Sequence, residues 1–257
     1  MSFFEKMLAS VGIGNATVDT RLRNSQVRVG DKLEGVVHIK GGSTDQQIDS
    51  IYLQLMTQYL KPQGDNNTVR VTTSVCKWEV SRPIQLGAGQ EREVPFSFAV
   101  PLNVPITLGK VPVWLKTGLD IDNAVDPGDT DKLEVLPHPH MKAVLDAVTS
   151  MGFQLKTSTC EYSSRLGRDL PFVQEIEFHP SGRFGGVKEL ELVFSVRPDG
   201  VEVIVEVDRR ARSLGGLLAA ALDMDESKER VFFSTSELSS RQHLSEQLAS
   251  IIQAHSG

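Results

Sequence analysis

Two histidines in the stretch LPHPHM, His138 and His140, have the spacing of a pair of metal ligands. Imidazoles at positions i and i+2 of an extended segment lie on one face, and imidazole is a common ligand for transition metals. A typical site needs a third protein ligand, and the sequence identifies none. The prolines instead indicate a rigid linker that leads into a helix, so no metal site is predicted here.

A run of acidic residues before this linker has the composition of a calcium-binding loop. An EF-hand loop places oxygen ligands at positions 1, 3, 5 and 12 and glycine at position 6. Counting from Asp120, position 5 is Ala124 and position 6 is Val125, so the pattern fails. A solvated connection between two domains is the favoured interpretation. The run consists of Asp120, Asp122, Asn123, Asp126, Asp129 and Asp131.

Catalytic signatures are missing from the sequence. It contains no GK[ST], HExxH, GxSxG or CxxC motif, and its two cysteines, Cys76 and Cys160, have no recognisable spacing. The glycines of VGDKLEGVVHIKGG bracket a strand as turn residues and do not follow the strand, glycine, helix order of a phosphate-binding loop. We therefore expect no catalytic residue, cofactor or metal. A hydrolase or a small-molecule binding protein remains a distant alternative.

An apolar stripe at helical spacing lies at the N-terminus and is the first candidate partner-binding surface. Three interpretations are open. The stripe contacts a protein partner or a second copy of the chain, it binds at a membrane surface, or it packs on the protein's own sandwich. The membrane interpretation is disfavoured, because interfacial helices usually carry several positive charges and this segment has only Lys6. The stripe consists of Phe3, Phe4, Met7, Leu8 and Val11, of which the first four are the candidate contact residues.

A basic cluster in VEVIVEVDRRARSLGG is the second candidate partner-binding surface. Arg209, Arg210 and Arg212 have the charge to dock an acidic partner or a phosphate group. Ordinary pairing with neighbouring acidic residues is the competing interpretation, because short charge runs usually form solvated faces.

Strands dominate the first half of the chain. In the segment 51–59, Ile51, Leu53 and Leu55 alternate with Tyr52 and Gln54, which is the period of a half-buried strand. Similar alternation recurs between clusters of Gly, Pro, Asn and Asp, without intervening helices. Strands this frequent predict an antiparallel β-sandwich.

The second half adds helices to a β-rich pattern. Met141, Val144 and Val148 have helical spacing, and Gly152 is a natural stop. Strands follow, and the tail 236–255 has the pattern of one helix with Ser236 as its N-cap. We expect a sandwich with an N-terminal amphipathic helix over residues 1–136. Residues 137–257 should form a smaller β-rich domain with a linker helix and a C-terminal helix.

Charge and hydropathy exclude several classes of protein. Residues 1–136 hold 14 basic and 16 acidic residues and residues 137–257 hold 13 and 17, so neither half offers a basic surface for nucleic acid. No apolar run has the length of a membrane-spanning helix, and the N-terminus does not have the pattern of a secretory signal. These features, with the few cysteines, predict a cytoplasmic protein.

Several motifs together resemble a known family. The stretches VRVGDKLEGVVHIKGG and EVPFSFAVPLNVPITLGKVPVWLKTGLDID resemble the arrestin-like sandwich, and SFFEKMLASVGIGNATVDTRL and VEVIVEVDRRAR resemble the bacterial sporulation-control proteins of the stage-zero, M type. The resemblance implies an arrestin-like first domain, no catalysis and a regulatory role. We expect an adaptor that recognises protein partners through strand edges, loops or terminal helices. A peripheral membrane-associated scaffold is the alternative.

Overall fold

The computed structural model describes residues 16–64, 67–81, 83–121, 126–182, 184–209 and 228–256. The N-terminal stripe, Phe3, Phe4, Met7, Leu8 and Val11, and two of the three clustered arginines, Arg210 and Arg212, lie outside these residues. The described chain forms two compact units, each assembled from three segments. The first unit is 1–57, 72–101 and 112–135, and the second is 58–71, 102–111 and 136–257.

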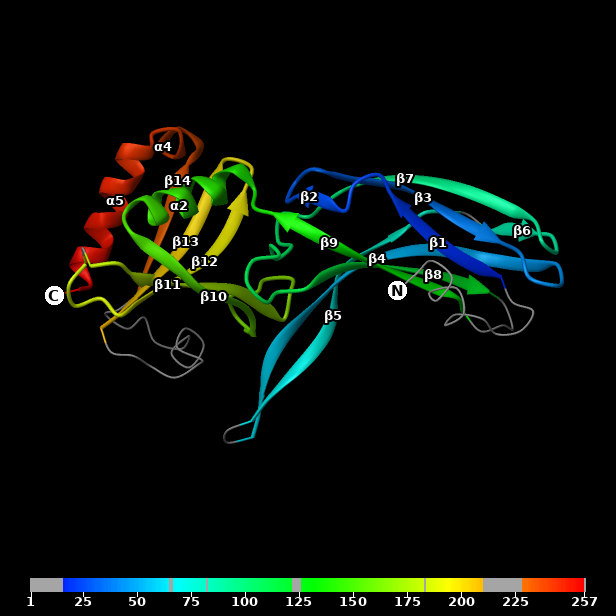
Figure 1. The fold of residues 1–257 in the computed structure, drawn as a ribbon, viewed down its shortest axis with the longest axis horizontal. Helices are drawn as coiled ribbons and strands as arrows, with labels where there is room; N and C mark the ends of the chain where they lie inside the picture. Colours follow the sequence, from blue (N-terminus) through cyan, green and yellow to red (C-terminus); the bar gives the residue numbers. More distant parts are fainter. Residues whose placement is uncertain are drawn as a thin grey trace. The chain divides into compact units, whose positions relative to one another are not determined.

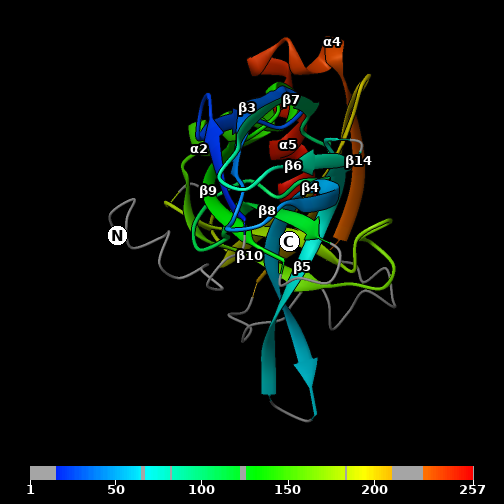
Figure 2. The same cartoon turned by 90° about the vertical axis from the view of Figure 1, so that its right-hand side faces the viewer.

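The first unit consists of two layers of antiparallel strands, as expected for a sandwich (Figure 1). One layer has the order β1-β3-β7, and the other has the order β4-β8-β9-β2, with β5 and β6 also paired to β4. Figure 2 shows β3 and β7 as a layer separate from β4 and β8. The strands are β1 (Thr17–Leu22), β2 (Gln26–Arg28), β3 (Lys32–Lys40), β4 (Gln46–Gln63), β5 (Asn67–Glu79), β6 (Ile84–Leu86), β7 (Glu91–Ala99), β8 (Val113–Ile121) and β9 (Gly128–Leu136).

Alternation along β4 builds the core of this unit, as the sequence predicts. Ile51, Leu53 and Leu55 are fully buried, whereas Tyr52 and Gln54 on the opposite face are half-buried. The rings of Trp78 and Phe98 stack with centroids 5.1 Å apart, and Phe96 and Phe98 stack at 5.9 Å. Buried apolar side chains from both layers therefore hold the sandwich together.

Two glycines of the VGDKLEGVVHIKGG stretch lie where the backbone conformation or packing disfavours a side chain. Gly30 has a φ of 89°, a left-handed conformation that favours glycine in a turn. Gly35 lies opposite Phe96 in the pairing of β3 with β7, and a Cβ there would lie 2.6 Å from the Arg21 carbonyl oxygen. The glycines thus permit a turn and a close approach between strands.

Within the described residues, the second unit contains an antiparallel run of strands in the order β14-β13-β12-β11-β10 and the helices α2, α4 and α5; β10 also pairs in parallel with β4 at Leu60. Helix α2 (Pro139–Ser150) contacts β10, β12 and β13, and it also contacts the C-terminal helix α5 (Figure 1). The strands are β10 (Phe153–Tyr162), β11 (Phe172–Pro180), β12 (Glu189–Arg197), β13 (Gly200–Asp208) and β14 (Lys228–Ser234). The linker helix and the strands β10 to β13 occur where the sequence predicts them, whereas β14 was not expected.

One detail of the C-terminal helical pattern is wrong. The tail forms two helices, α4 (Thr235–Leu238) and α5 (Arg241–Ala254), and Ser236 caps neither of them. Ser234 caps α4 through a capping box with Glu237, and Ser240 caps α5 by accepting a hydrogen bond from the His243 amide. Because serine competes with the helix for backbone hydrogen bonds, the serine-rich stretch supports two caps and a break between them.

Candidate functional site

A group of acidic side chains lies on one face of the second unit's sheet. Alternation along β12 and β13 directs Leu190, Leu192, Val203 and Val205 to the face that α2 covers, where they are fully buried. The opposite face, here called the polar face, carries acidic residues that are also buried. This carboxylate cluster consists of Glu175, Glu177, Glu189, Glu191, Glu206 and Asp208.

Strand register brings the cluster together. Glu177 of β11 pairs with Glu191 of β12, and Glu191 in turn pairs with Glu206 of β13. Glu189 pairs with Asp208 in the same way. Directly paired residues have Cβ atoms roughly 4.5–5.5 Å apart, so like charges at these positions repel strongly.

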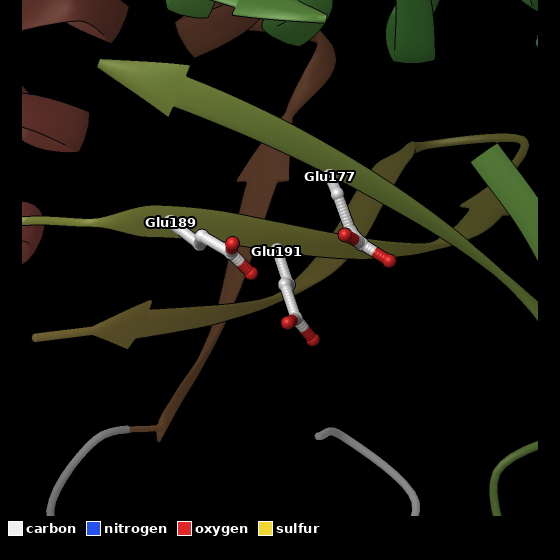
Figure 3. Close-up of side chains that lie close together, drawn as sticks. All are labelled: Glu177, Glu189 and Glu191. Atoms are coloured by element: carbon white, nitrogen blue, oxygen red, sulfur yellow. The ribbon is translucent and has the colours of Figure 1, made fainter. Parts of the chain in front are cut away.

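Three of these carboxylates form the tightest group. One oxygen each from Glu177, Glu189 and Glu191 lie within 4.8 Å of one another (Figure 3). The Nζ atom of Lys156 on β10 lies 3.0 Å from Glu177 Oε2 and 2.8 Å from Glu189 Oε1. A single ammonium group thus bridges two of the three carboxylates.

Two buried carboxylate oxygens of the cluster lack hydrogen-bond partners within the described residues. These are Glu191 Oε2 and Glu175 Oε1, and the two residues are only 5% and 3% exposed. A buried polar atom without a partner costs free energy, so this part of the sheet is not optimised for stability.

This environment raises the pKa values of Glu191, Glu175 and Lys156. Burial, reinforced by the charges of Glu206 and Glu177, raises the pKa of Glu191 to about 8. Burial and the neighbouring Glu191 raise the pKa of Glu175 well above its ordinary value. The hydrogen bond with Glu189 raises the pKa of Lys156, which keeps the ammonium charged. The cluster therefore binds positive charge or protons.

The other end of the polar face is basic. Glu202 accepts a hydrogen bond from Arg197 at 2.7 Å, and its carboxylate lies 3.6 Å from both Arg168 and Arg230. Arg165, Arg168 and Arg230 line a pocket of about 80 Å³ together with Glu202. Three arginines thus lie close to one carboxylate and Arg165 lines the same pocket, which leaves an excess of positive charge.

The edge of the sheet adjoins this basic end. β14 is the terminal strand of the sheet in the described chain. Its Phe232 is 39% exposed, and the Arg197 guanidinium lies 5.5 Å from the centre of the Phe232 ring. Leu155 is the other large hydrophobic residue exposed among the described residues.

Of the residues that the sequence singles out for partner binding, Arg209 alone lies within the described chain. It follows Asp208 directly after β13 and is exposed. The role of the stripe and of the other two arginines in partner binding stays a prediction. The two histidines shape the start of α2, because His138 Nδ1 accepts a hydrogen bond from the His140 amide and His140 Nδ1 lies 3.1 Å from the Gly200 carbonyl oxygen.

Sequence reasoning missed the carboxylate cluster. Its signal is the alternation of acidic and apolar residues in QEIEF, KELEL and VEVIVEVD. Such alternation is normally taken as a strand with one solvated face. Glutamates at i and i+2 on several neighbouring strands were the available clue to a shared acidic surface.

The fold and these surfaces define a mainly β protein with an arrestin-like fold, as the sequence predicts. The chain belongs to the SpoOM protein family, whose sequence profile matches residues 4–211. It is 42% identical over 254 residues to the sporulation-control protein Spo0M of Bacillus subtilis strain 168, with 98% of each chain covered. The crystal structure of Spo0M from Bacillus subtilis superposes with a TM-score of 0.88 at 41% identity, covering 95% of this chain and 100% of that one. The resemblance drawn from the sequence motifs is therefore confirmed.

In the described chain, no helix is long and apolar enough to cross a membrane.

Proposed function

We propose that this protein is a non-enzymatic, cytoplasmic regulator in sporulation control that acts by recognising a protein partner. The sporulation role is supported by the similarity to the Bacillus subtilis sporulation-control protein over nearly the whole chain. We assign recognition of the partner to the edge of β14 and to Arg165 and Arg230 beside it. The partner is an extended, acidic segment of another protein.

The edge of β14 carries this proposal. A terminal strand presents backbone N–H and C=O groups that an extended segment pairs with, and side-chain pockets then supply specificity. Phe232 is an exposed aromatic anchor on this strand, and aromatic residues contribute much of the binding energy in protein interfaces.

Charge defines the partner further. Arg230 is 50% exposed, and Arg165 lines the pocket beside it. Because Glu202 is the one carboxylate that lines this pocket, an acidic side chain on the partner offsets the excess positive charge. The net charge of −6 opposes nucleic acid as the ligand.

In-cell crosslinking tests the assignment. A photoreactive aromatic amino acid replaces Phe232 in one strain and Leu155 in a matched strain, because both positions are exposed and apolar. We expect a discrete protein adduct from position 232 during sporulation and none from position 155. The same adducts from both positions, or none from 232, would contradict the proposal.

Binding measurements with the purified partner then test whether the basic end of the polar face contributes to affinity. Arg230→Glu should weaken binding of the identified partner at least tenfold, because it reverses a charge at the recognition surface. Arg21→Glu is the matched control, since Arg21 is similarly exposed but lies on β1 of the first unit. Equal affinity of the two variants would remove the basic end of the polar face from the interface.

A further inference from the structure

We propose that Glu177, Glu189 and Glu191 bind a divalent cation of the calcium type. The three carboxylates come from adjacent strands and point into one small region of the polar face (Figure 3). This inference is independent of partner recognition, because its site lies at the acidic end of the face.

A fourth carboxylate of the cluster, outside the group of three, also indicates a missing ligand. Glu175 lies two residues before Glu177 on β11, so the two side chains share a face. It is only 3% exposed, and its Oε1 atom lacks a hydrogen-bond partner within the described residues. An oxygen buried in this way near the Glu191 and Glu177 carboxylates is explained when a cation binds among them.

The donor atoms select the kind of cation. All the ligands are carboxylate oxygens, which suit hard cations, whereas zinc prefers histidine and cysteine. Calcium accepts six to eight oxygens in flexible geometry, and carboxylates supply one or two oxygens each. Magnesium usually keeps several waters, which a buried site accommodates poorly.

Lys156 now occupies part of this region. Its ammonium contacts Glu177 and Glu189, and the Lys156 side chain as a whole is 32% exposed, so this flexible side chain has a path to solvent. A divalent cation at the same carboxylates repels the ammonium and displaces it. Lys156 thus acts as an internal counter-ion that the bound cation replaces.

Calcium titration of the full chain is the test. After treatment with a chelator and its removal, calcium chloride is added while heat of binding and melting temperature are measured. We expect saturable binding of one calcium ion per chain and a rise in melting temperature, because a ligand that binds the folded state stabilises it. Absence of both effects up to about 10 mM calcium, well above the weakest ordinary calcium sites, would overturn the proposal.

Variants locate the ion. Glu191→Gln keeps the shape of the side chain and removes its charge, so it should fold and lose calcium binding. Glu177→Gln provides a second variant with the same expectation. Glu229→Gln changes a more exposed carboxylate on β14 and should bind calcium as the unmodified chain does. Retained binding in both cluster variants, or loss in Glu229→Gln as well, would reject this site.

Discussion

At the scale of single residues, the carboxylate cluster costs the second unit stability. Like charges at directly paired positions repel, and burial removes the water that would screen them. Replacing such groups by apolar residues of similar volume is often neutral or stabilising in proteins. The cluster is therefore better explained by a ligand than by a contribution to folding.

Stability should fall with rising pH when divalent cations are removed by a chelator. Because the pKa of Glu191 is about 8 in the folded chain and near 4.5 when unfolded, the folded state holds this proton more tightly. The associated stability is fully present below pH 4.5 and is lost as the pH rises through 8, with a slope of at most about 1.4 kcal/mol per pH unit. The charged groups around Glu191 are Glu175, Glu177, Glu189, Glu206, Asp208, Lys156 and Lys228.

Chemical denaturation between pH 6 and 9 measures this slope. Glu191→Gln should be less dependent on pH, since its amide does not titrate. A stability that is constant or increases over this range in the unmodified chain would show that Glu191 is already ionised.

At the scale of secondary structure, the tail shows how capping divides one periodic pattern into two helices. The apolar positions Leu244, Leu248 and Ile252 continue on one buried face of α5. Periodicity reports that face but does not locate the helix ends, which depend on local hydrogen bonds by serine side chains.

Removal of the α4 cap should therefore destabilise the protein. Ser234→Ala should lower the free energy of unfolding by about 1 kcal/mol, because the Glu237 amide loses its acceptor. Ser236→Ala is the matched control and should have little effect. Thermal unfolding of both variants distinguishes them, and a larger effect at Ser236 would restore the single-helix interpretation.

Strand β4 offers a test of register. Leu53→Ala should cost about 2–5 kcal/mol, since this side chain is fully buried, and Phe96→Ala should also be costly. Gln54→Ala on the other face should cost little. Equally small effects of the three substitutions, measured by denaturant unfolding, would contradict the assigned faces.

At the scale of the whole molecule, the chain contributes separate segments to each unit. The second unit contains residues 58–71 and 102–111 besides the C-terminal part, so its assembly needs chain from the middle of the sequence. Contacts between such distant segments are set by tertiary folding and have no local signature.

The N-terminal stripe belongs to this scale, because it is a candidate contact between chains. If Phe4 contacts a second copy, Phe4→Glu should reduce the molecular mass in solution and leave the melting temperature unchanged. Light scattering and thermal unfolding measure the two quantities. An unchanged mass with a lower melting temperature would instead place the stripe against its own sandwich.

The sequence by itself determined the fold class, the family and the principal strands and helices. These follow from local causes: period-two alternation in β4, the left-handed turn at Gly30, and helical spacing before Gly152. Only the tertiary structure decided that Glu177, Glu191 and Glu206 meet on one face and are buried. Their proximity depends on the register of three strands, and a shift of one residue would direct a strand's side chains to the opposite face.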